Sequence, residues 1–113
     1  MGEPQQTENG DSARGLALPQ VQQRELRYFV AVAEELHFSR AAERLEISQP
    51  PLSATIAQLE SKLGVQLLER NSRNVSMTPA GAELLVRARR ILLEVDEAVF
   101  AVRSVGANGA ATA

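Results

Sequence analysis

The sequence lacks cysteine altogether and contains a single histidine, His37, among its 113 residues. Without cysteine there is no disulfide scaffold, no thiolate–zinc site and no thiol nucleophile. A single histidine also argues against a histidine-based metal cluster and a Ser/His/Asp triad. No acid/base pair, phosphate-binding loop or metal-ligand spacing stands out elsewhere. We therefore expect no enzymatic activity, no metal and no cofactor.

Long apolar runs and a leader sequence are missing as well. None of the apolar stretches approaches the ~20 residues that a transmembrane helix requires. Residues 1–10 are polar and lightly acidic, unlike a signal peptide. The sequence therefore predicts a cytoplasmic chain with no membrane partner.

Net charge is small, −2, from 12 lysines and arginines against 14 acidic residues. Affinity for nucleic acid depends on local charge, however, more than on the total. Between Ser48 and Arg90 there are six basic and three acidic residues, a balance of +3. The middle of the chain is thus mildly basic, which permits contact with phosphates without establishing it.

Both ends of the chain lack a hydrophobic period. Residues 1–20 place glycine and proline among polar residues, and residues 106–113 read GANGAATA. We predict a flexible arm over 1–20 and a flexible tail over 106–113. One folded domain is expected over 21–79, followed by a helix over 80–105.

Three helices are predicted in the first half of that domain. The first covers about 22–36, with apolar residues on one face at helical spacing. The second is short, with Ser39 as its N-terminal cap and Ala41, Ala42 and Leu45 as its apolar side. His37, just before it, is expected to pack or to cap a loop rather than to bind a ligand.

The third helix has the clearest start signal. Ser48 is a good N-cap residue, and Pro50 and Pro51 follow in the first turn, where a missing N–H costs nothing. Its inward face is predicted to consist of Leu52, Ile56, Leu59 and Leu63, with Gly64 as the C-terminal cap.

Two short segments at 65–70 and 75–78 then predict a β-hairpin, with Arg70 and Arg73 at or near its tip. Thr78 and Pro79 form the start signal of a long helix. The predicted fold is mainly α: a winged helix-turn-helix of three helices plus a short β-hairpin wing, followed by a long dimerisation linker helix.

In such a fold the third helix lies in the DNA major groove. Its outward side would carry Gln49, Pro50, Ser53, Ala54, Ala57 and Ser61. Glutamine can pair with adenine, serine can bond several base edges, and small apolar groups suit a thymine methyl. The same polar face would also suit an ordinary solvated helix, so the order of the features favours DNA binding more than any single residue does.

Three runs closely resemble the N-terminal domain of LysR-type transcriptional regulators. They are LRYFVAVAEELHFSRAAERLEISQPPLS at 26–53, QLESKLGVQLLER at 58–70 and MTPAG at 77–81. The resemblance implies a helix-turn-helix at about 38–57 and binding of double-stranded DNA at interrupted palindromes. The expected DNA-binding residues are Ser39, Arg40, Ser48, Gln49, Pro50, Pro51, Ser53, Ala54, Arg70 and Arg73.

The sequence departs from the family pattern in three respects, one of which is the wing, often more basic in the family than Asn74 and Ser76 allow. Ala54, Thr55 and Ala57 stand where the family often has basic or glutamine residues, which puts guanine reading by arginine in doubt. The family also continues with a two-lobed sensing domain, for which no residues remain after Ala113. We therefore expect no small-molecule inducer site in this chain.

The long helix carries a heptad seam of Leu84, Ala88, Ile91, Val95, Ala98, Val102 and Val105, widened by Leu85, Leu92 and Val99. This pattern predicts a homodimer. The resemblance implies an antiparallel pair, and possible tetramers when a sensing domain is attached. Two alternatives remain open: a helix folded back on its own domain, and a coiled-coil protein-interaction module without DNA readout.

Overall fold

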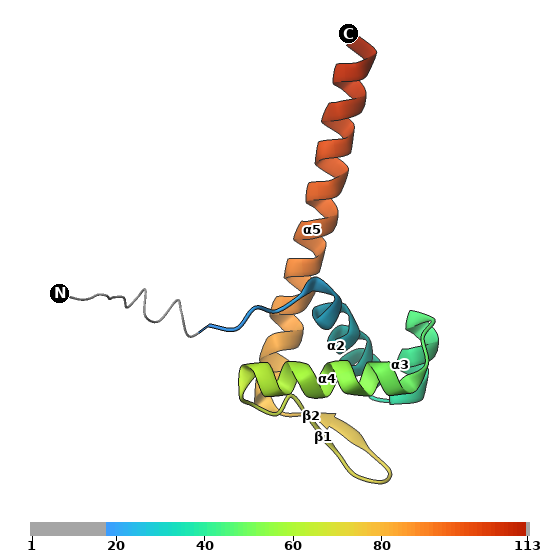
Figure 1. Cartoon of the computed structure of the whole chain (residues 1–113), viewed down its shortest axis with the longest axis vertical. Coiled ribbons are helices and arrows are strands. Elements are labelled where there is room, and N and C mark those ends of the chain that lie inside the picture. The colour runs from blue at the N-terminus through green and yellow to red at the C-terminus, as the bar shows by residue number, and fades with distance from the viewer. Residues whose placement is uncertain (1–17, 113) are drawn as a thin grey trace, which may run out of the picture.

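The computed structural model describes residues 18–112, with side chains through Gly109. Its elements are the helices α2 (Gln23–Glu35), α3 (Phe38–Leu45) and α4 (Gln49–Leu63), strands β1 (Leu68–Arg70) and β2 (Val75–Met77), and helix α5 (Pro79–Thr112). The three shorter helices form a head, the hairpin extends below it, and α5 rises out of it (Figure 1). Most of the predicted flexible arm lies outside the described residues. Within that range, no helix is both long and apolar enough to cross a membrane.

Helix α2 is the centre of the head. A capping box starts it: the Gln22 side chain accepts from the backbone of Glu25, and the Glu25 carboxylate accepts from the backbone of Gln22 at 2.8 Å. Leu36, the last residue of the helix predicted over 22–36, instead follows its end in the left-handed conformation (φ 51°) and is exposed. The largest fully buried side chains come from α2, from α4 and from the start of the wing: Phe29, Val32, Leu52, Ile56, Leu59, Leu67 and Leu68.

The prediction that Ser39 caps α3 was wrong. His37 is the N-cap, with extended backbone, and its Nδ1 accepts from the backbone N–H of Arg40 at 3.1 Å. Because α2 ends at Leu36 and the chain is extended at His37, helix α3 already begins at Phe38. The expectation that His37 packs or caps is confirmed, and the Ser39 hydroxyl is free for another partner.

Helix α4 begins and ends where the sequence predicts. Ser48 occupies the N-cap position with extended backbone, although its side chain makes no capping hydrogen bond. Gly64 ends the helix at φ 71°, a conformation that favours glycine. The predicted inward face is confirmed, since Leu52, Ile56 and Leu59 are fully buried and Leu63 packs against the core.

The wing is a two-stranded antiparallel hairpin in which Glu69 pairs with Ser76. The side chain of Asn71 closes its turn by accepting from the backbone N–H groups of Arg73 and Asn74, each at 2.8 Å. Only three residues on each side are paired, fewer than predicted. One further backbone bond crosses the base of the hairpin, from the N–H of Thr78 to the carbonyl oxygen of Leu67 at 3.0 Å.

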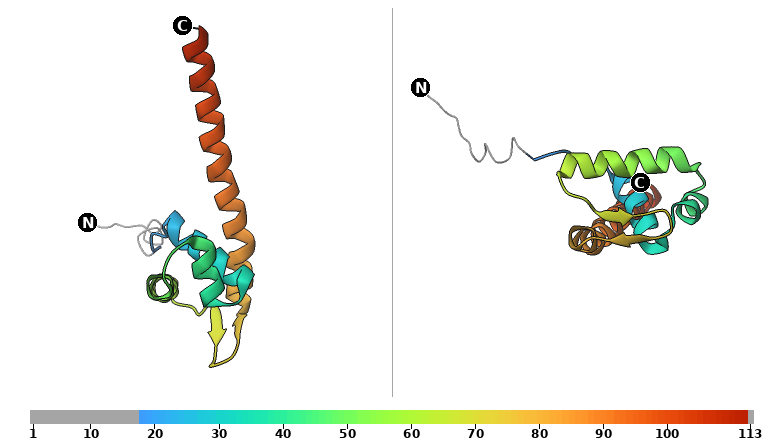
Figure 2. Two further views of the ribbon diagram at one scale, coloured as in Figure 1. Left: turned by 90° about the vertical axis from the view of Figure 1, so that its right-hand side faces the viewer. Right: turned by 90° about the horizontal axis from the view of Figure 1, so that it is seen from below.

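Helix α5 continues to Thr112 rather than ending at Val105, so the tail predicted to be flexible is helical over 106–112. Gly106 and Gly109 each cost about 1 kcal/mol relative to alanine. No proline follows to end the helix, and the alanines in this segment favour it. The last turns of α5 project away from the head in Figure 1 and in the left view of Figure 2.

Candidate nucleic-acid interface

The predicted DNA-reading surface is formed by the start of α4 and the start of α3. Helix α4 crosses the front of the head, so that one long side faces away from the other helices (Figure 1). Ser53 is half-buried, whereas the other residues predicted for this surface are exposed: Ser39, Arg40, Ser48, Gln49, Pro50, Pro51 and Ala54. The first turn of α4 contains no acidic residue. The positive end of the helix dipole therefore favours a negatively charged nucleic acid. The small side chains leave room for the edges of its bases.

Two of these residues meet directly. The Ser39 hydroxyl donates to Oε1 of Gln49 at 3.1 Å, which joins the first turn of α3 to the first turn of α4. Arg40 follows Ser39, and its guanidinium makes no hydrogen bond or ion pair within residues 18–109. The structure thus brings a polar cluster and an unpaired cation to one corner of the head.

The two wing arginines differ in their surroundings. Arg73 lies in the exposed turn, and its guanidinium makes no ion pair within the described part of the chain. Arg70 contacts Glu60 at 3.3 Å and lies over the ring of Phe38 at 4.9 Å. Arg70 is therefore held against the head, whereas Arg73 is free to reach a phosphate.

Glu60 is a connecting residue that sequence reasoning missed. Besides Arg70, its carboxylate accepts from the backbone N–H groups of Leu67 and Leu68, at 2.9 and 3.2 Å. These bonds fasten the base of the wing to the C-terminal half of α4. The wing and the reading helix therefore form one unit.

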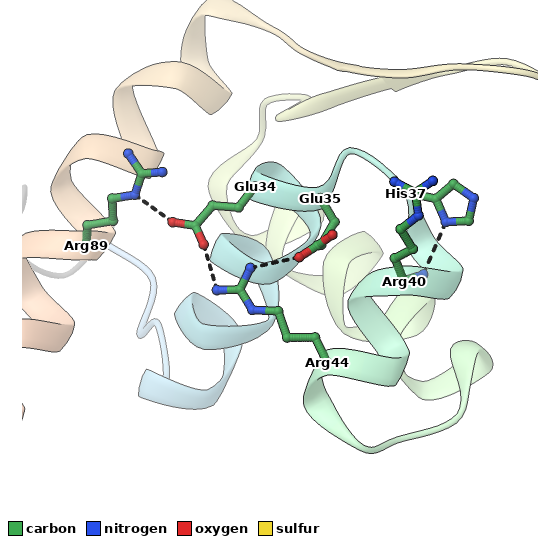
Figure 3. Close-up of polar contacts among 6 residues, drawn as sticks. All are labelled: Glu34, Glu35, His37, Arg40, Arg44 and Arg89. Atoms are coloured by element: carbon green, nitrogen blue, oxygen red, sulfur yellow. Dashed lines mark hydrogen bonds and ion pairs between the residues drawn. The ribbon is translucent and has the colours of Figure 1, made fainter.

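A second missed cluster joins α2, α3 and α5 (Figure 3). Glu34 accepts from Arg44 at 2.6 Å and from Arg89 at 2.8 Å, while Arg44 also contacts Glu35 at 3.3 Å. The bonds from Arg44, and then from Arg89, lower the pKa of Glu34 despite partial burial. Hydrogen bonding to Glu34 correspondingly raises the pKa of Arg44. One carboxylate thus fixes both the short helix and the long helix to α2.

The ion pair between Glu25 and Lys62 contains the most buried carboxylate among these contacts. Glu25 has a side chain only 3% exposed, and it contacts Nζ of Lys62 at 2.8 Å. Burial raises the pKa of Glu25, but the backbone bond at Gln22 and the bond from Lys62 outweigh it and lower the pKa overall. Lys62 also donates to the carbonyl oxygen of Gln20 at 3.0 Å. The pair therefore holds the chain entering α2 against the end of α4.

The predicted dimerisation seam divides into two parts. Ala88 and Leu92 are buried in their own head, together with Leu85, so they do not belong to a surface for a partner. Leu84 packs against the same core, and Val95 is half-buried. The rest of the seam is exposed: Ile91, Ala98, Val99, Val102 and Val105. Periodicity did not separate the parts, because the head occupies the first turns of the same apolar stripe.

These features define a winged helix-turn-helix protein, and the comparisons with known proteins specify the family. Residues 23–82 match the family described as bacterial regulatory helix-turn-helix protein, lysR family. The chain belongs to this LysR family.

The relatives are regulators. The chain is 58% identical over 78 residues to the uncharacterized HTH-type transcriptional regulator YnfL of Escherichia coli K12, covering 69% of this chain and 26% of that protein. It is 50% identical over 82 residues to the regulator BenM of Acinetobacter baylyi, covering 73% and 27%. The chain thus spans about a quarter of the length of these relatives.

Solved structures resemble the fold, among them two of DNA-bound domains. A BenM_DBD/catB site 1 DNA complex matches with a TM-score of 0.74 and 48% identity, covering 76% of this chain and 96% of that chain. A CbnR_DBD–DNA complex matches with a TM-score of 0.73 and 42% identity, covering 76% and 99%. Nearly the whole of each DNA-bound domain therefore has a counterpart here.

Proposed function

We propose that this chain is the sequence-specific DNA-binding portion of a LysR-type transcriptional regulator. The observation that carries the proposal is the likeness to two DNA-bound domains over 96% and 99% of their length. The regulators among the relatives support a non-enzymatic role, and a DNA-binding role supports a cytoplasmic location.

In this proposal α4 enters the major groove, and its first turn meets the bases. Gln49 and Ser53 read base edges, while Pro50 and Ala54 offer small apolar surfaces to thymine methyls. Arg73 in the wing and Arg40 contact phosphates, because both guanidinium groups are exposed and without an ion pair in the described residues. Arg70 supports the wing instead.

We further propose that the chain acts as a homodimer through the distal half of α5 and binds two half-sites of an interrupted palindrome. Val102 and Val105 are about 70% exposed, at 71% and 72%, beyond the reach of the head. An apolar stripe of this kind, repeated every seven residues, suits a second helix. A coiled-coil module that does not bind DNA would use the same apolar stripe. That alternative does not explain why the head matches two DNA-bound domains.

Selection from a randomised double-stranded DNA library tests the DNA-binding role. We expect the chain to enrich a common half-site and to bind it ~10³-fold or more tightly than shuffled DNA, as sequence-specific proteins do. Fluorescence anisotropy at several salt concentrations measures both affinities. Equal affinity for selected and shuffled DNA would contradict the proposal.

The dimer needs a separate test, for which Val102→Asp is the informative change. Val95, at the centre of the seam, is already half-buried within its own chain, so a charge there would also disturb the fold. Val86→Asp is the matched control: Val86 is 55% exposed and lies roughly 160° around the helix from Val102. Light scattering should report monomers for Val102→Asp and dimers for the control. A wild-type monomer at tens of micromolar would refute the dimer.

A further inference from the structure

The bond between Ser39 and Gln49 bears on which base the reading helix selects. Gln49 is the first residue of α4, and its side chain reaches back to α3, where the Ser39 hydroxyl donates to Oε1 at 3.1 Å. Both residues are exposed at the surface assigned to DNA. No other hydrogen bond of either side chain is found within residues 18–109, so Nε2 of Gln49 carries two free N–H groups.

The two ends of a glutamine amide read different base edges. A free glutamine pairs with adenine by accepting from N6 and donating to N7, which requires the oxygen and the nitrogen to lie side by side against the base. In this chain the bond from Ser39 occupies one lone pair of the oxygen and turns the oxygen toward α3. The nitrogen end remains for the DNA, and it can only donate. Guanine presents acceptors at both N7 and O6, whereas adenine places a competing donor at N6.

We propose that Ser39 is a specificity-determining residue that acts through Gln49: its hydroxyl holds the amide as a hydrogen-bond donor, so that the first position of α4 prefers guanine over adenine. The inference rests on the proposed DNA-binding function. It supplies a route to guanine recognition in a helix that has alanine, rather than arginine, at positions 54 and 57. Ser39 is a positioning residue in this account and need not touch the base itself.

The test compares base preferences among variants on the half-site obtained by selection. Gln49→Ala first locates the base pair that Gln49 reads, as the position where preference flattens. At that position Ser39→Ala should raise the adenine-to-guanine binding ratio about fivefold or more, because the freed oxygen can complete the adenine pair. Ser39→Thr keeps a hydroxyl and should keep the wild-type ratio.

Several controls separate this inference from other roles of Ser39. Because His37 caps α3, Ser39→Ala should melt like the wild type, which circular dichroism verifies. Should it unfold, Ser39→Cys, which has only a weak S–H donor, should show the same shift. In a Gln49→Ala background, Ser39→Ala should leave the ratio unchanged.

An unchanged ratio in Ser39→Ala, with affinity lowered equally for all sequences, would overturn the inference and make Ser39 a phosphate contact. A shift in Ser39→Thr as large as that in Ser39→Ala would overturn it too. Either result leaves the proposed DNA-binding function intact. Failure of the wild type to select any half-site would instead remove that function.

Discussion

Gly81, in the first turn of α5, is a position where alanine should destabilise the protein although alanine is ordinarily the better helix residue. A Cβ atom built at Gly81 would lie 2.0 Å from the carbonyl oxygen of Leu67 and 3.0 Å from its carbonyl carbon. Both atoms belong to the backbone just before β1, so no side-chain rotation relieves the overlap. Gly81 therefore permits the close approach of α5 to the base of the wing.

The magnitude follows from three contributions. Helix propensity favours alanine by about 1 kcal/mol. Overpacking of a tight contact costs about 1–3 kcal/mol, and this contact falls at the upper end because backbone must move. Moving the Leu67 carbonyl also strains its 3.0 Å bond from Thr78, worth about 1 kcal/mol. We expect a net loss of about 3 kcal/mol, or a Tm lower by roughly 12–24 °C for a domain of this size.

Thermal melting followed by circular dichroism, at one fixed concentration because association shifts Tm, measures the effect. Gly106→Ala is the matched control in the same helix, since a Cβ there meets nothing within 4 Å. It should be neutral or stabilising by up to about 1 kcal/mol. Equal Tm values for Gly81→Ala and wild type would refute the close approach of α5 and the wing.

Three further outcomes are expected. Lys62→Met should lower the free energy of unfolding, measured in urea, by about 2–3 kcal/mol. The loss is smaller than for a fully buried pair because the Lys62 side chain is 31% exposed. Adding Glu25→Gln should restore most of the lost stability, because the buried carboxylate charge is then removed. The free energy of unfolding should fall as pH drops below about 4.3, the usual glutamate pKa. The pKa of Glu34 is lowered in the folded state, so its contribution to stability is complete above pH ~4.3. That contribution is lost as the pH falls through the lowered pKa of the folded state. Acid titration of Glu34→Gln should show a shallower fall, and an identical curve would contradict the assignment. Arg73→Ala should reduce the salt slope of DNA binding by about 0.9 and weaken all sequences alike; an unchanged slope would place Arg73 away from phosphate.

The local elements of the fold could be predicted because each has its cause in neighbouring residues. Helix α4 follows from Ser48, Pro50 and Gly64, and the wing turn follows from the segment Asn71–Asn74. The start of α3 was misassigned because serine is the commoner cap, whereas the extended backbone at His37 depends on how α2 ends. That ending is a local event, but the sequence alone does not separate His37 from Ser39, two positions later, as the cap.

The ion pairs that join the elements could not be predicted. Glu34 and Arg89 lie 55 positions apart, and Glu25 and Lys62 lie 37 apart. Their meeting depends on the packing angles of whole helices, which a charge pattern does not contain. Among the predicted DNA-contact residues, Ser39 and Gln49 are joined by a hydrogen bond, and the attachment of Arg70 to Glu60 likewise required the fold. Their individual roles on DNA remain predictions.

The apolar stripe of helix α5 has two parts. Its first turns pack against the head, and its later turns are the proposed contact with a partner helix. Leu85, Ala88 and Leu92 bury it against α2, and the contact between Arg27 and Asp96 at 3.3 Å lies one turn further along. With Arg89 bound to Glu34, these contacts fix the direction in which the helix leaves the head. The exposed turns beyond Asp96 gain little from propensity alone, since most helical stability in proteins comes from packing an apolar face. In the proposed dimer, therefore, a partner helix both stabilises these turns and sets the spacing of the two reading helices through rigid elements, so that the half-site separation becomes part of the recognition.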